Sequence, residues 1–191
     1  IVDTSITATG LSPMAYAQRL GLLDQPTLLG HVNYLDEEEL AILAAGRASV
    51  VYCPRSHAFF GHARHPVDRM LAAGVNVCLG TDSLASNTSL SILDEMRWLH
   101  RHRRDLSGSA VVAMGTIRGA AALGRGERFG SIGPGKAADP GAGAVDQAGG
   151  AGTVENVREG DLGSSGVWIR GRTAAGGGLR REGKHDEPVL K

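Results

Sequence analysis

The segment at residues 75–83 reads VNVCLGTDS, a short apolar run that stops at a glycine, a hydroxyl and a carboxylate. An apolar run of this length, entered from a turn at residues 72–74, predicts a buried strand from a parallel set that is covered on both faces. Asp82 then lies at the carboxyl end of that strand. In parallel α/β architectures this end faces the ligand crevice. Asp82 is therefore a candidate hard ligand or general base.

Asp82 taken alone also has a plainer interpretation. A loop aspartate more often caps the next helix or closes an Asx turn than it binds a ligand. The choice between the two depends on what stands at the other strand ends.

Two further segments predict strands with similar ends. The sequence TLLGHVNY at residues 27–34 predicts a buried strand that stops at a polar cluster, so His31 takes the same kind of place as Asp82. The sequence ASVVYCP at residues 48–54 predicts a third strand, and Pro54 fits its end because proline cannot donate within a sheet interior.

Helical patterns alternate with these strands. Ser12 and Pro13 are typical of a helix start, and Asp36 with Glu39 forms an acidic variant of the capping box. The predicted helices span residues 13–20, 37–45, 67–73, 89–100 and 109–123. Strands that alternate with helices over residues 12–123 predict an α/β fold with a parallel sheet and right-handed crossovers.

The segment RSHAFFGHARHP at residues 55–66 is too long for a simple turn, and we expect a functional loop. Its three histidines have two interpretations. They pack and cap the loop, or His62 and His65 shape the rim of a pocket beside His57. A zinc site made of these three alone matches no closed structural-zinc pattern, because cysteine and carboxylate partners are absent from the loop.

Composition narrows the function class. The chain has 191 residues, 42% of them apolar, with 20 basic and 20 acidic side chains. A pI near 7.2 gives no electrostatic reason to expect nucleic acid. We interpret the basic cluster at residues 101–104 as a solvated helix end.

The two cysteines, Cys53 and Cys78, lie in apolar runs, where a free thiol behaves as a small hydrophobic group, so a cytoplasmic location fits them best. Because a signal peptide, an apolar stretch near 18 residues and a lipidation motif are all missing from the sequence, we expect no membrane association. A start at Ile1 is typical of a piece of a longer protein.

Five ordered blocks carry a family resemblance. They read GHVNYLDEEEL (30–40), VVYCPRSH (50–57), AGVNVCLGTDS (73–83), MGTIRGAAALG (114–124) and GSIGPGKAAD (130–139). Together they resemble the C-terminal half of the amidohydrolase superfamily, in the branch of cytosine deaminase, chlorohydrolase and adenosine-deaminase-like enzymes. The resemblance covers roughly residues 12–139 and is more specific than any single motif.

The resemblance implies a (β/α)8 TIM barrel of which residues 1–129 hold the last three βα units, followed at residues 130–140 by the start of a small β-sandwich. It implies one divalent metal, zinc or iron, with Asp82 as a metal ligand that also takes a proton from the attacking water. His31 matches the histidine that holds or polarises that water. Ser56, His57 and Ser83 are substrate-pocket candidates.

The implied reaction is metal-dependent hydrolysis of a non-peptide carbon–nitrogen bond in a small molecule, as in deamination of a purine or pyrimidine derivative. A metal that lowers the pKa of water and a carboxylate that deprotonates it make such chemistry possible near neutral pH.

The chain also departs from the family pattern. The first-strand His-x-His pair is missing; His100 and His102 have that spacing, but on a helix they point to different faces. The fifth-strand His-x-x-Glu is missing too, so we expect this chain alone not to bind the metal fully. The alternative function is therefore a catalytically inactive fragment or pseudoenzyme.

Residues 141–191 form a Gly/Ala-rich tail in place of returning β-sandwich strands, which predicts disorder or an out-of-frame segment. Three barrel strands alone would expose apolar edges, so we expect aggregation or a partner, with a homo-oligomer as one possibility.

Overall fold

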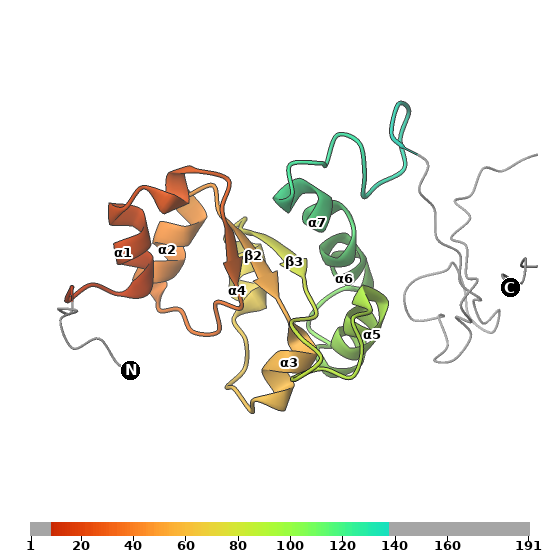
Figure 1. Cartoon of the computed structure of the whole chain (residues 1–191), viewed down its shortest axis with the longest axis horizontal. Helices are drawn as coiled ribbons and strands as arrows, with labels where there is room; N and C mark the ends of the chain where they lie inside the picture. The colour runs from red at the N-terminus through yellow and green to blue at the C-terminus, as the bar shows by residue number, and fades with distance from the viewer. Residues whose placement is uncertain (1–8, 138–191) are drawn as a thin grey trace, which may run out of the picture.

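The computed structural model describes residues 9–137, and these form an α/β fold around a three-stranded parallel sheet. The strands are β1 (Leu28–Gly30), β2 (Ser49–Tyr52) and β3 (Asn76–Leu79), in the order β1-β2-β3 (Figure 1). Leu29 pairs with Val50, and Val50 with Val77. The predicted parallel sheet is confirmed, although each strand is shorter than its apolar run.

The two edge strands differ in burial. Val77 is fully buried and Leu79 is 7% exposed, as expected for a covered strand. Leu28 is 46% exposed and Leu29 is half-buried, so the prediction that residues 27–34 form a buried strand is wrong. The reason is cover by helices, because several helices contact β3, whereas β1 contacts mainly β2 within the described residues.

Two helices lie beside β1. The first, α1 (Pro13–Arg19), begins where Ser12 Oγ accepts a hydrogen bond from Ala15 N, and a 3-10 turn (Leu22–Asp24) follows it. The second, α2 (Glu37–Ala45), has the predicted capping box, in which Asp36 and Glu39 each accept from the other's backbone N–H. Both predicted helix starts are confirmed.

The segment at residues 55–66 is not one long loop. Its first part belongs to α3 (Pro54–Phe59), and α4 (Val67–Ala72) follows after a short connection. Pro54 begins α3 because its fixed φ suits the first helical turn, where an N–H has no partner within the helix. A residue predicted to end a strand therefore also starts a helix, and the connection that remains between the two helices is short.

Three later helices contact β3 in addition to α4: α5 (Ile92–His102), α6 (Gly108–Gly115) and α7 (Ile117–Ala122). The helix predicted over residues 109–123 is split at Thr116, whose φ of −134° and ψ of −94° leave the helical region. The helix predicted from residue 89 begins later, after the N-cap Ser91, and Leu90 is 59% exposed instead of buried.

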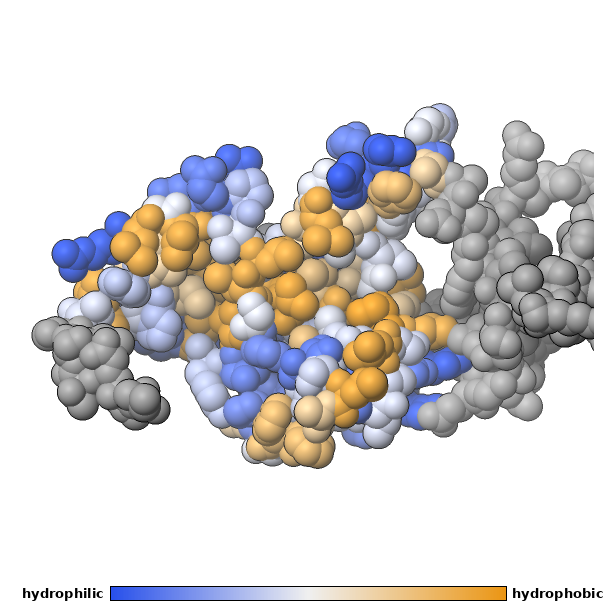
Figure 2. All heavy atoms as spheres, in the orientation of Figure 1, coloured by the Kyte–Doolittle hydropathy of each residue, from blue (hydrophilic) through white to orange (hydrophobic). Residues whose placement is uncertain are grey.

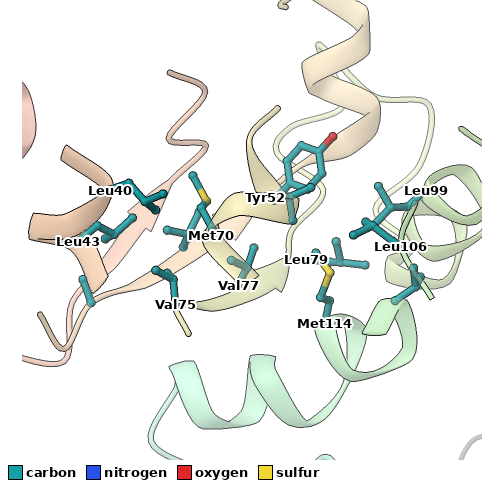
Figure 3. Close-up of a cluster of buried hydrophobic side chains, with 14 of the residues drawn as sticks. Leu40, Leu43, Tyr52, Met70, Val75, Val77, Leu79, Leu99, Leu106 and Met114 are labelled. Carbon is teal, nitrogen blue, oxygen red and sulfur yellow. The ribbon is translucent and has the colours of Figure 1, made fainter. Parts of the chain in front are cut away.

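The hydrophobic core runs across the sheet from α2 to α6 (Figure 3). Leu43 comes from α2, Met70 from α4, Leu99 from α5 and Met114 from α6, and each is at most 1% exposed. Removing such a side chain from water contributes about 1.5–3 kcal/mol. This core fixes where the strands end, and the strand ends carry the candidate site.

The basic cluster at residues 101–104 is not wholly solvated. Arg103 is 8% exposed, donates to the backbone oxygen of His65 at 3.0 Å, and pairs with Asp68 and Asp105 at 3.2 and 2.8 Å. The interpretation as a solvated helix end is therefore wrong for this residue. Two carboxylates, which the sequence alone does not place near it, compensate its buried charge.

Apolar side chains reach the surface across the middle of the molecule, between α1 and α2 on one side and α5 to α7 on the other (Figure 2). Within residues 9–137 none of the helices has the length and apolar character needed to cross a membrane. The predictions for residues 138–191 lie outside the described residues.

Candidate active site at the strand ends

The loops that follow the strands enclose one pocket. The lining residues follow β1, lie on α3 or just after it, or follow β3. They are His31, Asn33, Ser56, His57, Phe60, His62 and Asp82. Four of the five predicted site residues thus come together here, namely Asp82, His31, Ser56 and His57. Ligands of parallel α/β folds bind at this end of the sheet.

Asp82 is held in an unusual backbone conformation. Its φ is 58°, in the left-handed region that non-glycine residues seldom adopt. Ser56 Oγ and Ser86 Oγ donate to its Oδ2 at 2.7 and 3.0 Å. These hydrogen bonds, chiefly the one from Ser56, hold the pKa of Asp82 below its usual value. The group is an exposed, ionised carboxylate at neutral pH.

Gly80 leaves room for two side chains that lie in β2 and just after it. Its N–H donates to Tyr52 O at 2.9 Å, one step beyond the strand, and a Cβ at this position would lie 2.5 Å from Val51 Cγ1 and 3.1 Å from Cys53 Sγ. A larger residue at this position would collide with the side chains of Val51 and Cys53, and glycine avoids the collision. The chain then turns at once to bring Asp82 to the pocket.

His31 lies at a tight turn. Its N–H donates to Val51 O at 2.8 Å, and Val32 N donates back to Gly30 O at 2.8 Å, so His31 with its φ of 64° is the centre of a γ-turn. Turns of this hand are rare and strained. The backbone oxygen of His31 accepts a hydrogen bond from His65 Nε2 at 2.8 Å.

His57 is a fixed wall of the pocket. Its Nε2 lies 2.8 Å from Ala63 O and its Nδ1 lies 2.9 Å from the Asn33 side chain. Burial, the largest effect, lowers the pKa of His57, which favours a neutral ring. The atom that faces His57 Nδ1 is Asn33 Oδ1, so a neutral ring, which has one N–H, donates to Asn33 Oδ1 or to Ala63 O but not to both.

The other two histidines of the loop have different places. His62 lines the pocket, with its Nδ1 2.9 Å from the Tyr34 hydroxyl. His65 is 1% exposed and stacks on Tyr52 with 3.8 Å between ring centroids, so it lies beneath the pocket and not on its rim. Burial lowers the pKa of His65 to about 4.

Ser83 does not line the pocket; it is exposed, and its Oγ accepts from Ala85 N at 3.3 Å. Sequence reasoning missed Asn33, Phe60 and Ser86. The signal for Asn33 was its place two residues after His31, in the same polar cluster. The contact of Ser86 with Asp82 could not be predicted, because nothing in the local sequence distinguishes Ser86 from Ser83 in the same loop.

Cys53 lies next to this site but is not a reactive thiol. It is 4% exposed, and burial raises its pKa to about 11, so the sulfur is protonated near neutral pH. A protonated thiol is neither a nucleophile nor a metal ligand. Both cysteines are buried and unpaired, which agrees with their predicted role as small apolar groups.

The residues fit part of a divalent-metal site. Asp82 offers an anionic oxygen, of the kind that zinc accepts, and His31 offers an imidazole in the same pocket. In the part of the chain from residue 9 to 137, no group of three or more His, Cys, Asp or Glu side chains could hold a metal ion. The donor set is therefore incomplete within these residues.

The sequence profile of the Amidohydrolase family matches residues 3–140. The chain belongs to the amidohydrolase family. The chain is 39% identical over 137 residues to a 5-methylthioadenosine/S-adenosylhomocysteine deaminase of Moorella thermoacetica, a match that covers 68% of the chain and 32% of the relative. It thus spans about a third of the length of the curated relatives it matches.

Solved structures give the same family. An adenosine deaminase from Xanthomonas campestris with bound zinc matches with a TM-score of 0.63 and 34% identity, over 71% of the present chain and 32% of the deaminase chain. The guanine deaminase of E. coli matches with a TM-score of 0.58 and 25% identity, over 63% and 29%. The family hydrolyses carbon–nitrogen bonds, as the blocks of sequence predicted.

Proposed function

We propose that this chain supplies the carboxyl-terminal catalytic part of a zinc-dependent deaminase, built as the last three βα units of a (β/α)8 barrel. The observation that carries the proposal is Asp82, an ionised, exposed carboxylate in left-handed backbone at the end of a buried parallel strand. The deaminase names of the relatives and the zinc in one similar structure support it.

Asp82 is proposed as a metal ligand and as the group that takes a proton from the attacking water. When bound, a divalent metal lowers the pKa of water toward neutrality and polarises the bond under attack. The hydrogen bonds from Ser56 and Ser86 both fall on Oδ2. Oδ1 is not used by either serine, so the carboxylate keeps an oxygen for a second task.

His31 is proposed to hold and orient the water. Its ring lines the same pocket as Asp82, and its backbone is fixed by hydrogen bonds on both sides. Proton transfer by positioned groups of this kind contributes about 10²–10⁴-fold to rate. In the proposed reaction water adds to the carbon that bears the amino group, and that carbon becomes a carbonyl as ammonia leaves.

The proposed substrate is an aminopurine nucleoside of the 5-methylthioadenosine or S-adenosylhomocysteine type, after the names of the relatives. Its ring would meet the pocket wall formed by Ser56, His57 and the exposed ring of Phe60. Ser83 stays a weaker candidate, because a contact would require the substrate to extend beyond the pocket lining.

The experiment compares the purified 191-residue chain with the full-length product read from the start of its gene. We expect the full-length product to hold about one zinc ion by plasma mass spectrometry and to release ammonia from 5-methylthioadenosine. Asp82→Asn should lose both, whereas the exposed Glu38→Gln should lose neither. A full-length product without metal or ammonia release would refute the proposal.

The second candidate is a pseudoenzyme or inactive fragment. It is favoured by one observation, the lack of a group of three metal-binding side chains across residues 9–137. A pseudoenzyme predicts that neither protein binds zinc and that Asp82 contributes only to folding, whereas an inactive fragment predicts zinc in the full-length product alone. The same metal analysis therefore separates a pseudoenzyme from the proposed deaminase.

A further inference from the structure

Glu95 is a buried carboxylate that the proposed mechanism does not use. It lies on α5, is 0% exposed and does not line the pocket. Its Oε2 accepts from the backbone N–H of Arg55 at 3.0 Å, and its Oε1 accepts from Asn87 Nδ2 at 2.6 Å. The guanidinium of Arg55 lies 3.8 Å from Oε1. A charge buried this fully is tolerated only when it is paired and hydrogen-bonded.

The two donors belong to the two segments that meet at Asp82. Arg55 immediately precedes Ser56, whose hydroxyl donates to the Asp82 carboxylate. Asn87 belongs to the loop after Asp82, and its Nδ2 also donates to the backbone oxygen of Thr81 at 2.8 Å. One carboxylate thus ties the first turn of α3 to the loop after β3.

We propose that Glu95 is a positioning residue that holds Ser56 and Asp82 in register through the Arg55 backbone and the Asn87 side chain. The inference rests on the proposed function in that Asp82 is the metal-binding carboxylate. It assigns no catalytic step to Glu95 itself, which contacts neither the pocket nor Asp82.

The need for such a residue follows from the backbone of Asp82. Its left-handed conformation persists only where the surroundings fix it from several sides. Asn87 fixes one of these sides, because it donates to the carbonyl of Thr81, the residue before Asp82. Its own Oδ1 accepts from Thr88 N at 2.9 Å. Without Glu95, the Asn87 amide loses the partner that orients it, because Nδ2 is shared between Glu95 and Thr81.

Two variants separate positioning from simple folding. Glu95→Gln keeps the shape but has one oxygen for two donors, so Arg55 N or Asn87 Nδ2 faces an NH2 group. The double variant Asn87→Asp with Glu95→Gln restores a donor–acceptor pair between the two side chains. It also places a carboxylate oxygen against the Thr81 carbonyl, so the link to Asp82 stays broken.

The first measurement is zinc affinity and thermal midpoint of the full-length product. Loss of a residue that orients a metal ligand lowers metal affinity by about 10–100-fold. We expect Glu95→Gln to lower both quantities. The double variant should recover only part of the thermal midpoint, because a carboxylate oxygen then faces the Thr81 carbonyl, and it should recover none of the affinity. The exposed Glu38→Gln on α2 is the matched control. Unchanged zinc affinity in Glu95→Gln, or affinity that recovers together with the midpoint, would overturn the inference.

The second measurement needs no metal and uses the 191-residue chain. In ¹⁵N correlation spectra, the backbone amides of Ser56, Asp82 and Ser86 should shift in Glu95→Gln and stay in place in Glu38→Gln. If those three amides do not move, Glu95 does not position them and the inference fails. If they move while the full-length product binds no zinc, the positioning holds and only the proposed function falls.

Discussion

The ends of β1 and β3 both bring a residue with positive φ into the pocket, but they are held in different ways. His31 follows a three-residue, half-exposed strand, and one buried side chain, His65, fixes its carbonyl. Asp82 follows a buried strand, and Ser56 and Ser86 hold its carboxylate while Asn87 holds the preceding carbonyl.

The two strand ends therefore differ in how closely they position the side chain that each carries. A metal ligand must lie within a few tenths of an ångström of its position, so the surrounding side chains must fix it from several sides. A residue that orients water tolerates more freedom. On this view the β3 end is held through the Asp82 side chain as well as the backbone, and the β1 end through the backbone of His31, and the following predictions test the contrast.

The largest effect is expected from charge removal at the β3 end. In the full-length product, Asp82→Asn should abolish stoichiometric zinc and lower kcat/KM by about 10²–10⁴-fold. His31→Gln should slow turnover while zinc stays bound, because the ring is proposed to orient water only. Metal analysis beside ammonia-release kinetics checks both variants. Equal loss of zinc in the two would erase the distinction between the strand ends.

The next largest effect is expected when a leucine in β3 is truncated, and the same change in β1 should cost less stability. Leu79→Ala in β3 removes a side chain that is 7% exposed and should cost about 2–5 kcal/mol of unfolding free energy. Leu28→Ala in β1 removes one that is 46% exposed and should cost less than about 1 kcal/mol. Urea denaturation of the 191-residue chain measures both. A larger loss for Leu28 would mean that its exposed surface is covered in solution.

The stability contributed by His65, which donates to the His31 carbonyl, should depend on pH. His65 has a pKa near 4 in the fold and 6.5 when unfolded, so between these values the unfolded chain binds a proton that the folded chain does not. The stability from neutral His65 is therefore complete above pH 6.5 and is lost as the pH falls toward 4, by roughly 3 kcal/mol.

Burial causes this shift, with smaller contributions of the same sign from His57 and Arg103, while the bond to His31 O and the charge of Asp68 oppose it. His65→Gln keeps an N–H for His31 O but cannot titrate. Denaturation series at pH 7, 5.5 and 4.5 should show a shallower loss for the variant than for the wild type. Parallel curves would contradict a depressed His65 pKa.

The smallest effect is expected in the loop after β1. Arg69 donates to Leu35 O and pairs with Glu37 at 2.7 Å, but the Glu37 side chain is 87% exposed. Exposed ion pairs contribute less than about 1 kcal/mol. Glu37→Gln should therefore change stability by only a few tenths of a kcal/mol in low salt and by less in 0.5 M salt. A loss above 1 kcal/mol would show that the loop after β1 is held more firmly than its exposure indicates.

Where sequence patterns were local, they predicted the structure well. The caps at Ser12 and at Asp36 with Glu39 were confirmed, because a cap depends on residues three positions apart. The break at Thr116 was missed although Gly115 and Thr116 interrupt the apolar pattern of residues 109–123; Gly115 lies against Met96 of α5, where a Cβ would not fit. Arg103 was misjudged because its partner Asp68 lies 35 positions away.

The sequence by itself determined the order of strands and helices, the family, and the placing of His31 and Asp82 at strand ends. These depend on the period of apolar residues and on glycine and proline, which act over a few positions. Only the tertiary structure decided that Ser56 and Ser86 hold Asp82, that Glu95 ties their segments together, and that β1 is exposed. The contacts of Ser56 with Asp82 and of Glu95 with Arg55 join residues 26 and 40 positions apart, and they exist because the core fixes the parallel register of the strands.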